Sequence, residues 1–129
     1  MFNKHLFTSI KDDWKTPKKF YEELDKEFNF NFDPCPSNPT FDGLEIEWKE
    51  RNFVNPPYGR NISKWIKKGY EEWKKGKVVI FLIPSRTDTK WWHEYIMKAT
   101  EIRFIKGRLK FEGYNGGSAP FPSAVIIFK

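Results

Sequence analysis

The apolar run Val78–Ile83 is the feature that most constrains how this chain can fold. A continuous apolar run of this length is typical of a strand buried on both faces of a sheet, whereas a half-exposed strand alternates apolar and polar residues. The run therefore predicts a central strand of the sheet. A chain of 129 residues is long enough for one domain of this kind.

The segments around this run predict an alternation of helices and strands. A first helix is expected from Thr16 as the N-cap and Pro17 as the first helical residue, with Phe20, Leu24 and Phe28 on one face. A second helix is expected from Asn61 or Ser63 to Gly76, and a third after residues 84–89. Further strands are expected at 30–33, 51–54, 101–105, 108–112 and 124–128.

This order predicts an α/β fold with a mostly parallel central sheet and antiparallel C-terminal strands. We expect a single domain over residues 1–129, of which residues 1–12 form an extended arm. Ligands bind at the carboxyl ends of strands in such sheets. Three polar loops follow predicted strands, at residues 33–39, 55–60 and 84–89, and are therefore candidates for a site.

Composition narrows the class of partner. Lys and Arg number 23 against 17 Asp and Glu, which gives a net charge of +6, and 19% of the residues are aromatic. A basic chain rich in aromatic rings suits nucleic acid, whose backbone is anionic and whose bases stack. The single cysteine, Cys35, excludes an intramolecular disulfide framework and a cysteine zinc cluster, so we expect no metal. No apolar run approaches the ~20 residues that a membrane span requires.

The tetrapeptide Asn55-Pro56-Pro57-Tyr58 can bind a planar ring that carries an amino group. The two prolines stiffen the backbone and remove two N–H donors, which leaves the Asn55 side-chain oxygen and the Pro56 carbonyl as acceptors. We expect Tyr58 to offer a flat face on which the ring stacks. Acceptors that hold both amine hydrogens favour a pyramidal nitrogen with a localised lone pair, which can attack an activated methyl donor.

This tetrapeptide resembles the catalytic motif of amino-group methyltransferases that use S-adenosylmethionine. Other motifs occur with it in order along the chain and resemble the phage-type DNA N6-adenine methyltransferases of the Dam group. These motifs are Asp13–Pro17, Asp33–Cys35, Asp42–Leu44, Asn55–Arg60, Pro84–Thr89 with Trp91–His93, Gly107–Phe111 and Ala119–Ser123. The series spans nearly the whole chain, and its ordered combination is far more specific than any one piece.

The resemblance implies a reduced Rossmann-like class I methyltransferase fold and methyl transfer from S-adenosylmethionine to adenine N6 in DNA. It implies that Asn55, Pro56, Pro57 and Tyr58 bind and activate a base flipped out of the helix. The residues expected beside the cofactor are Trp14, Thr16, Pro17, Asp33, Pro34, Cys35 and Asp42. It also implies a cytoplasmic protein of a bacterial or archaeal host cell, compatible with a viral or prophage origin, acting as a monomer or a homodimer.

Candidate DNA contacts lie outside this cofactor set. Arg86 lies in a strand-end loop, Arg108 and Lys110 precede a glycine-rich loop, and Arg60 follows the Asn-Pro-Pro-Tyr motif after Gly59. Strand-end loops of this fold carry ligands, which favours a phosphate or base contact for Arg86 over a surface ion pair with Asp88.

One departure from ordinary methyltransferases leaves alternatives open. No glycine-rich turn follows Asp33, and the second strand with its acidic ribose partner is missing, so Asp42 is only a substitute for that partner. A non-catalytic nucleic-acid-binding module with a degraded cofactor site therefore stays an alternative. Methylation of another amine or amide, in RNA adenine or protein glutamine, is a second one.

Overall fold

The computed structural model describes residues 14–114 and 117–129. Its helices are α2 (Lys18–Phe28), α3 (Ile62–Lys74) and α4 (Lys90–Glu94), followed by the short 3-10 helix η1 (Ile96–Lys98). Its strands are β1 (Arg51–Val54), β2 (Val78–Pro84), β3 (Glu101–Phe104) and β4 (Ser123–Phe128). The predicted arm at residues 1–12 lies outside the described residues.

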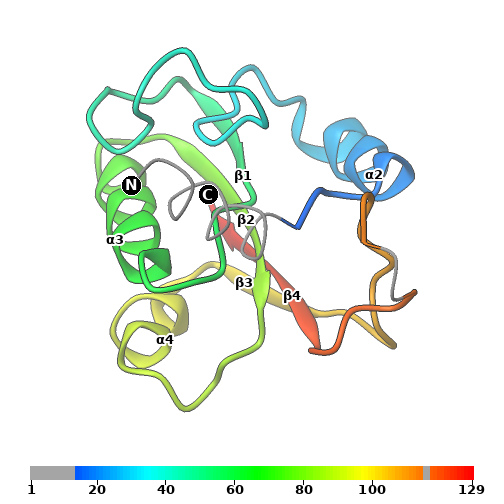
Figure 1. The fold of residues 1–129 in the computed structure, drawn as a ribbon. Helices are drawn as coiled ribbons and strands as arrows, with labels where there is room; N and C mark the ends of the chain where they lie inside the picture. Colours follow the sequence, from blue (N-terminus) through cyan, green and yellow to red (C-terminus); the bar gives the residue numbers. More distant parts are fainter. Residues whose placement is uncertain (1–13, 115–116) are drawn as a thin grey trace, which may run out of the picture.

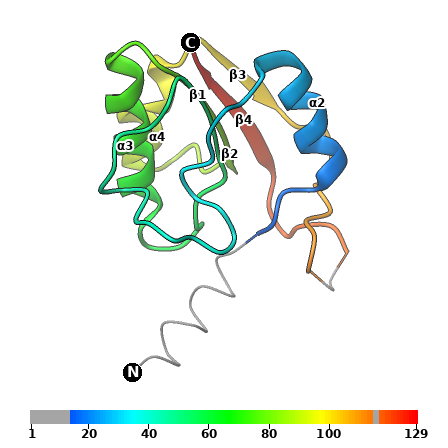
Figure 2. The ribbon, with the colours of Figure 1, turned by 90° about the horizontal axis from the view of Figure 1, so that it is seen from above.

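The four strands form one sheet in the order β1-β2-β4-β3. Figure 2 shows the sheet between two layers, with α3 and α4 on one face and α2 on the other. The predicted central strand is confirmed, because β2 lies inside the sheet and is buried from Val79 to Pro84. Strand β4 is buried along its whole length and pairs with β2 over six residues, from Val79↔Phe128 to Pro84↔Ser123.

The expectation of a mostly parallel sheet is met only in part. Strands β1 and β2 pair in parallel and are joined by the α3 crossover, while β4 pairs antiparallel with both β2 and β3. Because β4 enters between β2 and β3 instead of extending an edge, β3 runs in the direction of β1 and β2 but has β4 as its neighbour. The predicted antiparallel C-terminal strands are confirmed, and the result is a mixed α/β sheet.

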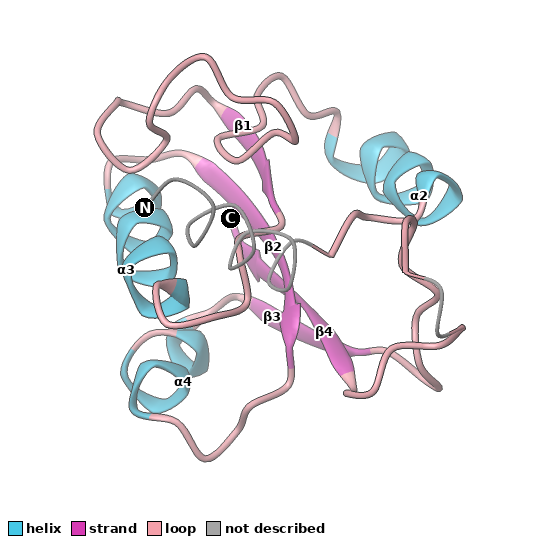
Figure 3. Cartoon of the chain, in the orientation of Figure 1, coloured by secondary structure: helices cyan, strands magenta, loops and turns pink. Residues whose placement is uncertain are grey.

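Two predicted strands are absent as regular elements, and Figure 3 shows loops in their place. Residues 30–33 contribute only the parallel bridge Phe32↔Asn52, because Pro34 and Pro36 supply no N–H with which to continue a ladder. Residues 108–112 contribute only the antiparallel bridge Lys15↔Glu112.

Helix α3 crosses β2 at very close range. A Cβ atom at Gly69 would lie 2.2 Å from Cζ of Phe81, so only glycine fits at this crossing. On the other face of the sheet, Tyr21 and Phe30 pack on Phe53. The ring centroid of Phe53 lies 5.1 Å from that of Tyr21 and 5.3 Å from that of Phe30. These contacts fix α2 and the loop after it against β1.

A buried carboxylate joins α3 to the loop before β1. The Glu72 side chain is 1% exposed and accepts hydrogen bonds from the ammonium groups of Lys68, Lys75 and Lys77 and from the Trp48 backbone N–H. Burial alone would raise the pKa of Glu72, but these four donors lower it to about 2. Local sequence pattern does not predict this buried centre, because the donors to Glu72 include Lys77 and the Trp48 backbone, which lie outside helix α3.

Candidate active site

A cavity of about 330 Å³ opens at the carboxyl end of β1, beside the start of α2. It is lined by Lys15, Thr16, Lys18, Tyr21, Asp33, Cys35, Ser37, Phe53, Asn55 and Glu112. Four of the residues predicted from the sequence therefore meet around one hollow: Thr16, Asp33, Cys35 and Asn55. They come from the segment before α2, the loop after it and the end of β1.

The Asn55 side chain is held at both ends. Its Nδ2 donates to the Trp14 carbonyl and, over 2.9 Å, to the Thr16 hydroxyl, while its Oδ1 accepts from the Tyr58 hydroxyl. A backbone carbonyl can only accept, so the Trp14 contact requires the amide nitrogen to face the segment before α2. An amide oxygen has two lone pairs, and the hydrogen bond from Tyr58 uses one of them.

Tyr58 orients this network from inside the protein. Its hydroxyl also lies 3.0 Å from the Leu82 carbonyl, and burial raises its pKa well above the usual value, so the hydroxyl stays a proton donor. The ring is 2% exposed and is covered by Phe111 and Phe121, whose centroids lie 6.2 and 5.6 Å away. The structure thus differs from the open aromatic face expected at Tyr58, because the loop between β3 and β4 packs over it.

Asp33 contributes a negative charge to the cavity. Its Oδ1 accepts from the Cys35 backbone N–H over 2.9 Å, and it makes no ion pair among the described residues. Burial raises the pKa of this carboxyl group, and the hydrogen bond from Cys35 opposes part of that rise. A cation bound in the cavity would therefore find a carboxylate that lacks a cationic partner.

Glu112 closes the cavity from a distant part of the chain. Its carboxylate accepts from the Lys18 backbone N–H over 2.9 Å, and its backbone pairs with Lys15. Glu112 therefore caps the start of α2, which was the role predicted for Thr16. The Thr16 hydroxyl instead accepts a hydrogen bond from Asn55. Helix α2 begins at Lys18, with Pro17 as the N-cap residue. Glu112 was missed because it lies 94 positions after Lys18, and a contact over that separation leaves no local signal in the sequence.

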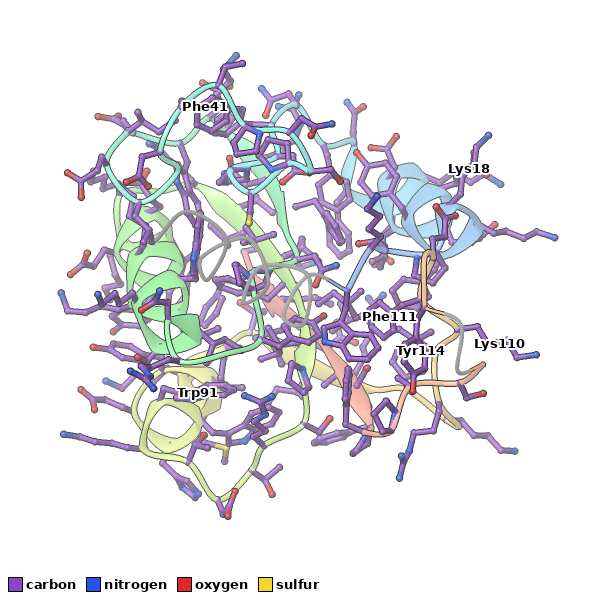
Figure 4. The ribbon with its side chains drawn as sticks, viewed as in Figure 1. Lys18, Phe41, Trp91, Lys110, Phe111 and Tyr114 are labelled. Atoms are coloured by element: carbon purple, nitrogen blue, oxygen red, sulfur yellow. The ribbon has the colours of Figure 1, made fainter. Side chains whose placement is uncertain are left out.

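The other predicted cofactor residues lie around the cavity and do not line it. Trp14 packs on Phe111, Tyr114 and Phe121, with centroids 5.6, 4.7 and 5.1 Å away. Figure 4 shows Phe111 and Tyr114 together in this region. Pro17 precedes α2, and Pro34 is buried against Gly43, where an added Cβ would lie 2.0 Å from the Pro34 oxygen. Asp42 is exposed and accepts from the Leu44 backbone N–H in its own turn.

The predicted DNA contacts fall into two groups. Arg86 donates to the Tyr58 carbonyl over 2.7 Å, so it braces the motif; among the described residues it makes no ion pair with Asp88. Arg60 is exposed before α3, while Arg108 lies 3.4 Å from the Ala119 carbonyl within its loop. Lys110 is exposed and points outward in Figure 4.

Comparison with known protein families gives a match over residues 3–124, to the family described as DNA N-6-adenine-methyltransferase (Dam). The chain therefore belongs to this family, as its ordered motifs predicted. The family implies DNA as the substrate and adenine N6 as the methylated position. Neither the search of curated proteins nor the search of solved structures found a match.

No cluster of three His, Cys, Asp or Glu side chains suited to a metal ion occurs in residues 14–114 and 117–129. None of the helices in these ranges is long and apolar enough to span a bilayer.

Proposed function

We propose that the protein transfers a methyl group from S-adenosylmethionine to adenine N6 in DNA, with the cofactor in the cavity at the end of β1 and the target amine at Asn55. One observation carries the proposal. Thr16, Asp33 and Asn55, each chosen from the sequence for this chemistry, line a single hollow at a strand carboxyl end. This is where α/β sheets bind their ligands.

The cavity suits the cofactor in size and in charge. Its volume of about 330 Å³ falls within the range of small-molecule sites. The Asp33 carboxylate, which makes no ion pair within residues 14–114 and 117–129, matches the cationic ammonium and sulfonium groups of S-adenosylmethionine. When bound, the cofactor supplies a methyl group activated by its sulfonium.

Asn55 is the residue that receives the target amine. Its oxygen keeps one lone pair for an N–H of the amine, and its orientation is fixed before the substrate arrives, by Thr16 on one side and Tyr58 on the other. In this proposal Tyr58 is a positioning residue in the free protein, and Pro56 and Pro57 keep the backbone rigid. Stacking of the adenine on Tyr58 would require Phe111 and Phe121 to move aside.

Access to Asn55 requires an unstacked base. An adenine inside the double helix cannot present its amine to a strand-end cavity, so the protein must flip the base or act on single strands. The covering rings of Phe111 and Phe121 belong to the loop between β3 and β4, so that loop is the segment that has to adapt.

The test is tritiated methyl transfer to unmethylated DNA by the wild type, Asn55→Ala and Asn61→Ala. Loss of a preorganised acceptor should lower the rate about 100-fold or more in Asn55→Ala. Asn61 makes no side-chain cap, so Asn61→Ala is a matched control and should keep wild-type activity. Full activity of Asn55→Ala would contradict the proposal.

Two further measurements separate the alternatives. Calorimetry with S-adenosylmethionine tests the non-catalytic module, because a degraded cofactor site would bind nothing. Methyl-transfer assays with RNA and with a glutamine-containing protein in place of DNA test whether another amine or amide is the substrate. Transfer to either of them without transfer to DNA would overturn DNA as the proposed substrate.

A further inference from the structure

A second hollow of about 390 Å³ lies between α3 and α4. We call it the α3–α4 groove; it is lined by Ser63, Lys64, Lys67, Lys90, Trp91, Glu94 and Tyr95. Figure 4 shows Trp91 in this region, on the side of the molecule away from Lys110. None of these seven residues lines the cavity at the end of β1.

The groove is basic, and two of its lysines have no ion-pair partner in the part of the chain that the structure describes. Its lining holds three lysines against one glutamate. Lys67 pairs with Glu71 over 2.7 Å, but Lys64 and Lys90, both exposed, make no ion pair within residues 14–114 and 117–129. They come from different helices, so the fold itself brings these two positive charges to one groove.

Aromatic side chains complete the lining. Trp91 is 9% exposed and forms part of the wall, and Tyr95 is half-buried beside it. Lysines that reach phosphates, next to rings on which a base or sugar can lie, are the combination used by surfaces that follow a nucleic-acid strand.

The groove lies at the same edge of the sheet as Asn55. Helix α3 begins after the loop that follows β1, and α4 begins after the loop that follows β2, so both helices start where the two parallel strands end. In Figure 1 the loop that leaves β1 runs across this edge to the start of α3, beside α4. Asn55 thus stands at one end of this loop and Ser63 just beyond the other.

We propose that the α3–α4 groove binds the DNA backbone that flanks the target adenine, with Lys64 and Lys90 each contacting a phosphate. This rests on the proposed function and adds a DNA-binding surface to it. It also locates this part of the DNA interface on the α3–α4 side of the molecule, opposite to the loop that carries Arg108 and Lys110.

The test is fluorescence anisotropy of a labelled unmethylated duplex, titrated at several salt concentrations with the wild type and with Lys64→Ala/Lys90→Ala. Each lost phosphate contact lowers the salt slope by about 0.9, so the slope should fall by about 1.8. The affinity at physiological salt should fall on the order of 10-fold, equally for unrelated sequences.

The matched control is Lys26→Ala/Lys74→Ala, which removes the same charge from exposed lysines in the last turns of α2 and α3. It should leave the slope and the affinity close to the wild type. Calorimetry with S-adenosylmethionine should give wild-type binding for both double variants, which shows that the fold and the cofactor cavity are intact.

The outcomes separate the two proposals. Equal losses in the groove variant and the control variant, or a loss only in Arg108→Ala/Lys110→Ala, would overturn the groove while leaving methyl transfer to DNA standing. A wild-type protein that binds no DNA would overturn the proposed function together with the groove.

Discussion

Replacing Glu72 with Gln should remove one of the largest single electrostatic contributions to the stability of this fold. The carboxylate is 1% exposed and has three lysine donors and one backbone donor, which together lower its pKa from 4.5 to about 2. A difference of about 2.5 pKa units corresponds to about 3 kcal/mol of unfolding free energy at neutral pH. Gln keeps the shape of the side chain but leaves the ammonium groups of Lys68 and Lys77 without their buried anion.

The pH dependence follows from the direction of the shift. Because the folded-state pKa of Glu72 is lowered, its contribution is complete above the unfolded value of 4.5 and is lost as the pH falls toward about 2. The gap between the wild type and Glu72→Gln should therefore shrink from about 3 kcal/mol at pH 7 to less than half of that near pH 3.

Urea unfolding followed by tryptophan fluorescence measures this gap at both pH values. The control is Glu71→Gln on the same helix, whose side chain is 50% exposed and pairs with the exposed Lys67, so its effect should be small. The reasoning is refuted if Glu72→Gln costs no more than Glu71→Gln at pH 7, or if the gap is the same at pH 3.

Two further predictions concern the site. Asp33→Asn should weaken binding of S-adenosylmethionine by about 10- to 100-fold in calorimetry, since a charge-assisted contact is lost. Burial raises the folded-state pKa of Asp33, so its ionised form destabilises the fold at pH values above that pKa. The unfolding free energy of Asp33→Asn at pH 7 should therefore be equal to or above that of the wild type. A clearly lower unfolding free energy would contradict this account. Tyr58→Phe should lower the unfolding free energy by about 1–2 kcal/mol, because the single O–H that the Asn55 amide oxygen and the Leu82 carbonyl share is lost. It should also slow methyl transfer with little change in cofactor affinity, and an unchanged rate would remove Tyr58 from the positioning of Asn55.

The regular parts of the fold could be predicted where local pattern decides them. The apolar run at β2 and the amphipathic spacing of α3 both indicate from the sequence which residues are buried. Thr89 caps α4 through its side chain, as is common for a threonine just before a helix. Strand pairing is a different matter. The apolar run in residues 124–128 is typical of a buried strand, but it does not indicate that β4 enters between β2 and β3, because that choice depends on contacts far apart in the chain.

The candidate site also contains residues that local sequence pattern predicts and residues whose roles depend on distant contacts. Thr16, Asp33 and Asn55 could be chosen from motifs because each lies next to a predicted element boundary. Glu112 could not, since its role depends on a contact with Lys18 that only the folded chain creates. The burial of Tyr58 was unpredictable for a similar reason, because the rings that cover it come from an irregular loop.

The position of β4 has a consequence for how the chain acquires its shape during synthesis. Strand β4 follows β3 in the chain but lies between β2 and β3 in the sheet, so β3 has no neighbour in this sheet until β4 has been synthesised. Helix α3 can pack against β1 and β2 earlier, but the pairing of β3 with the sheet must wait for β4, and pairings distant along the chain form slowly. Until β4 is in place, the apolar strand β2 has an open edge, which exposes the nascent chain to aggregation at that stage of synthesis.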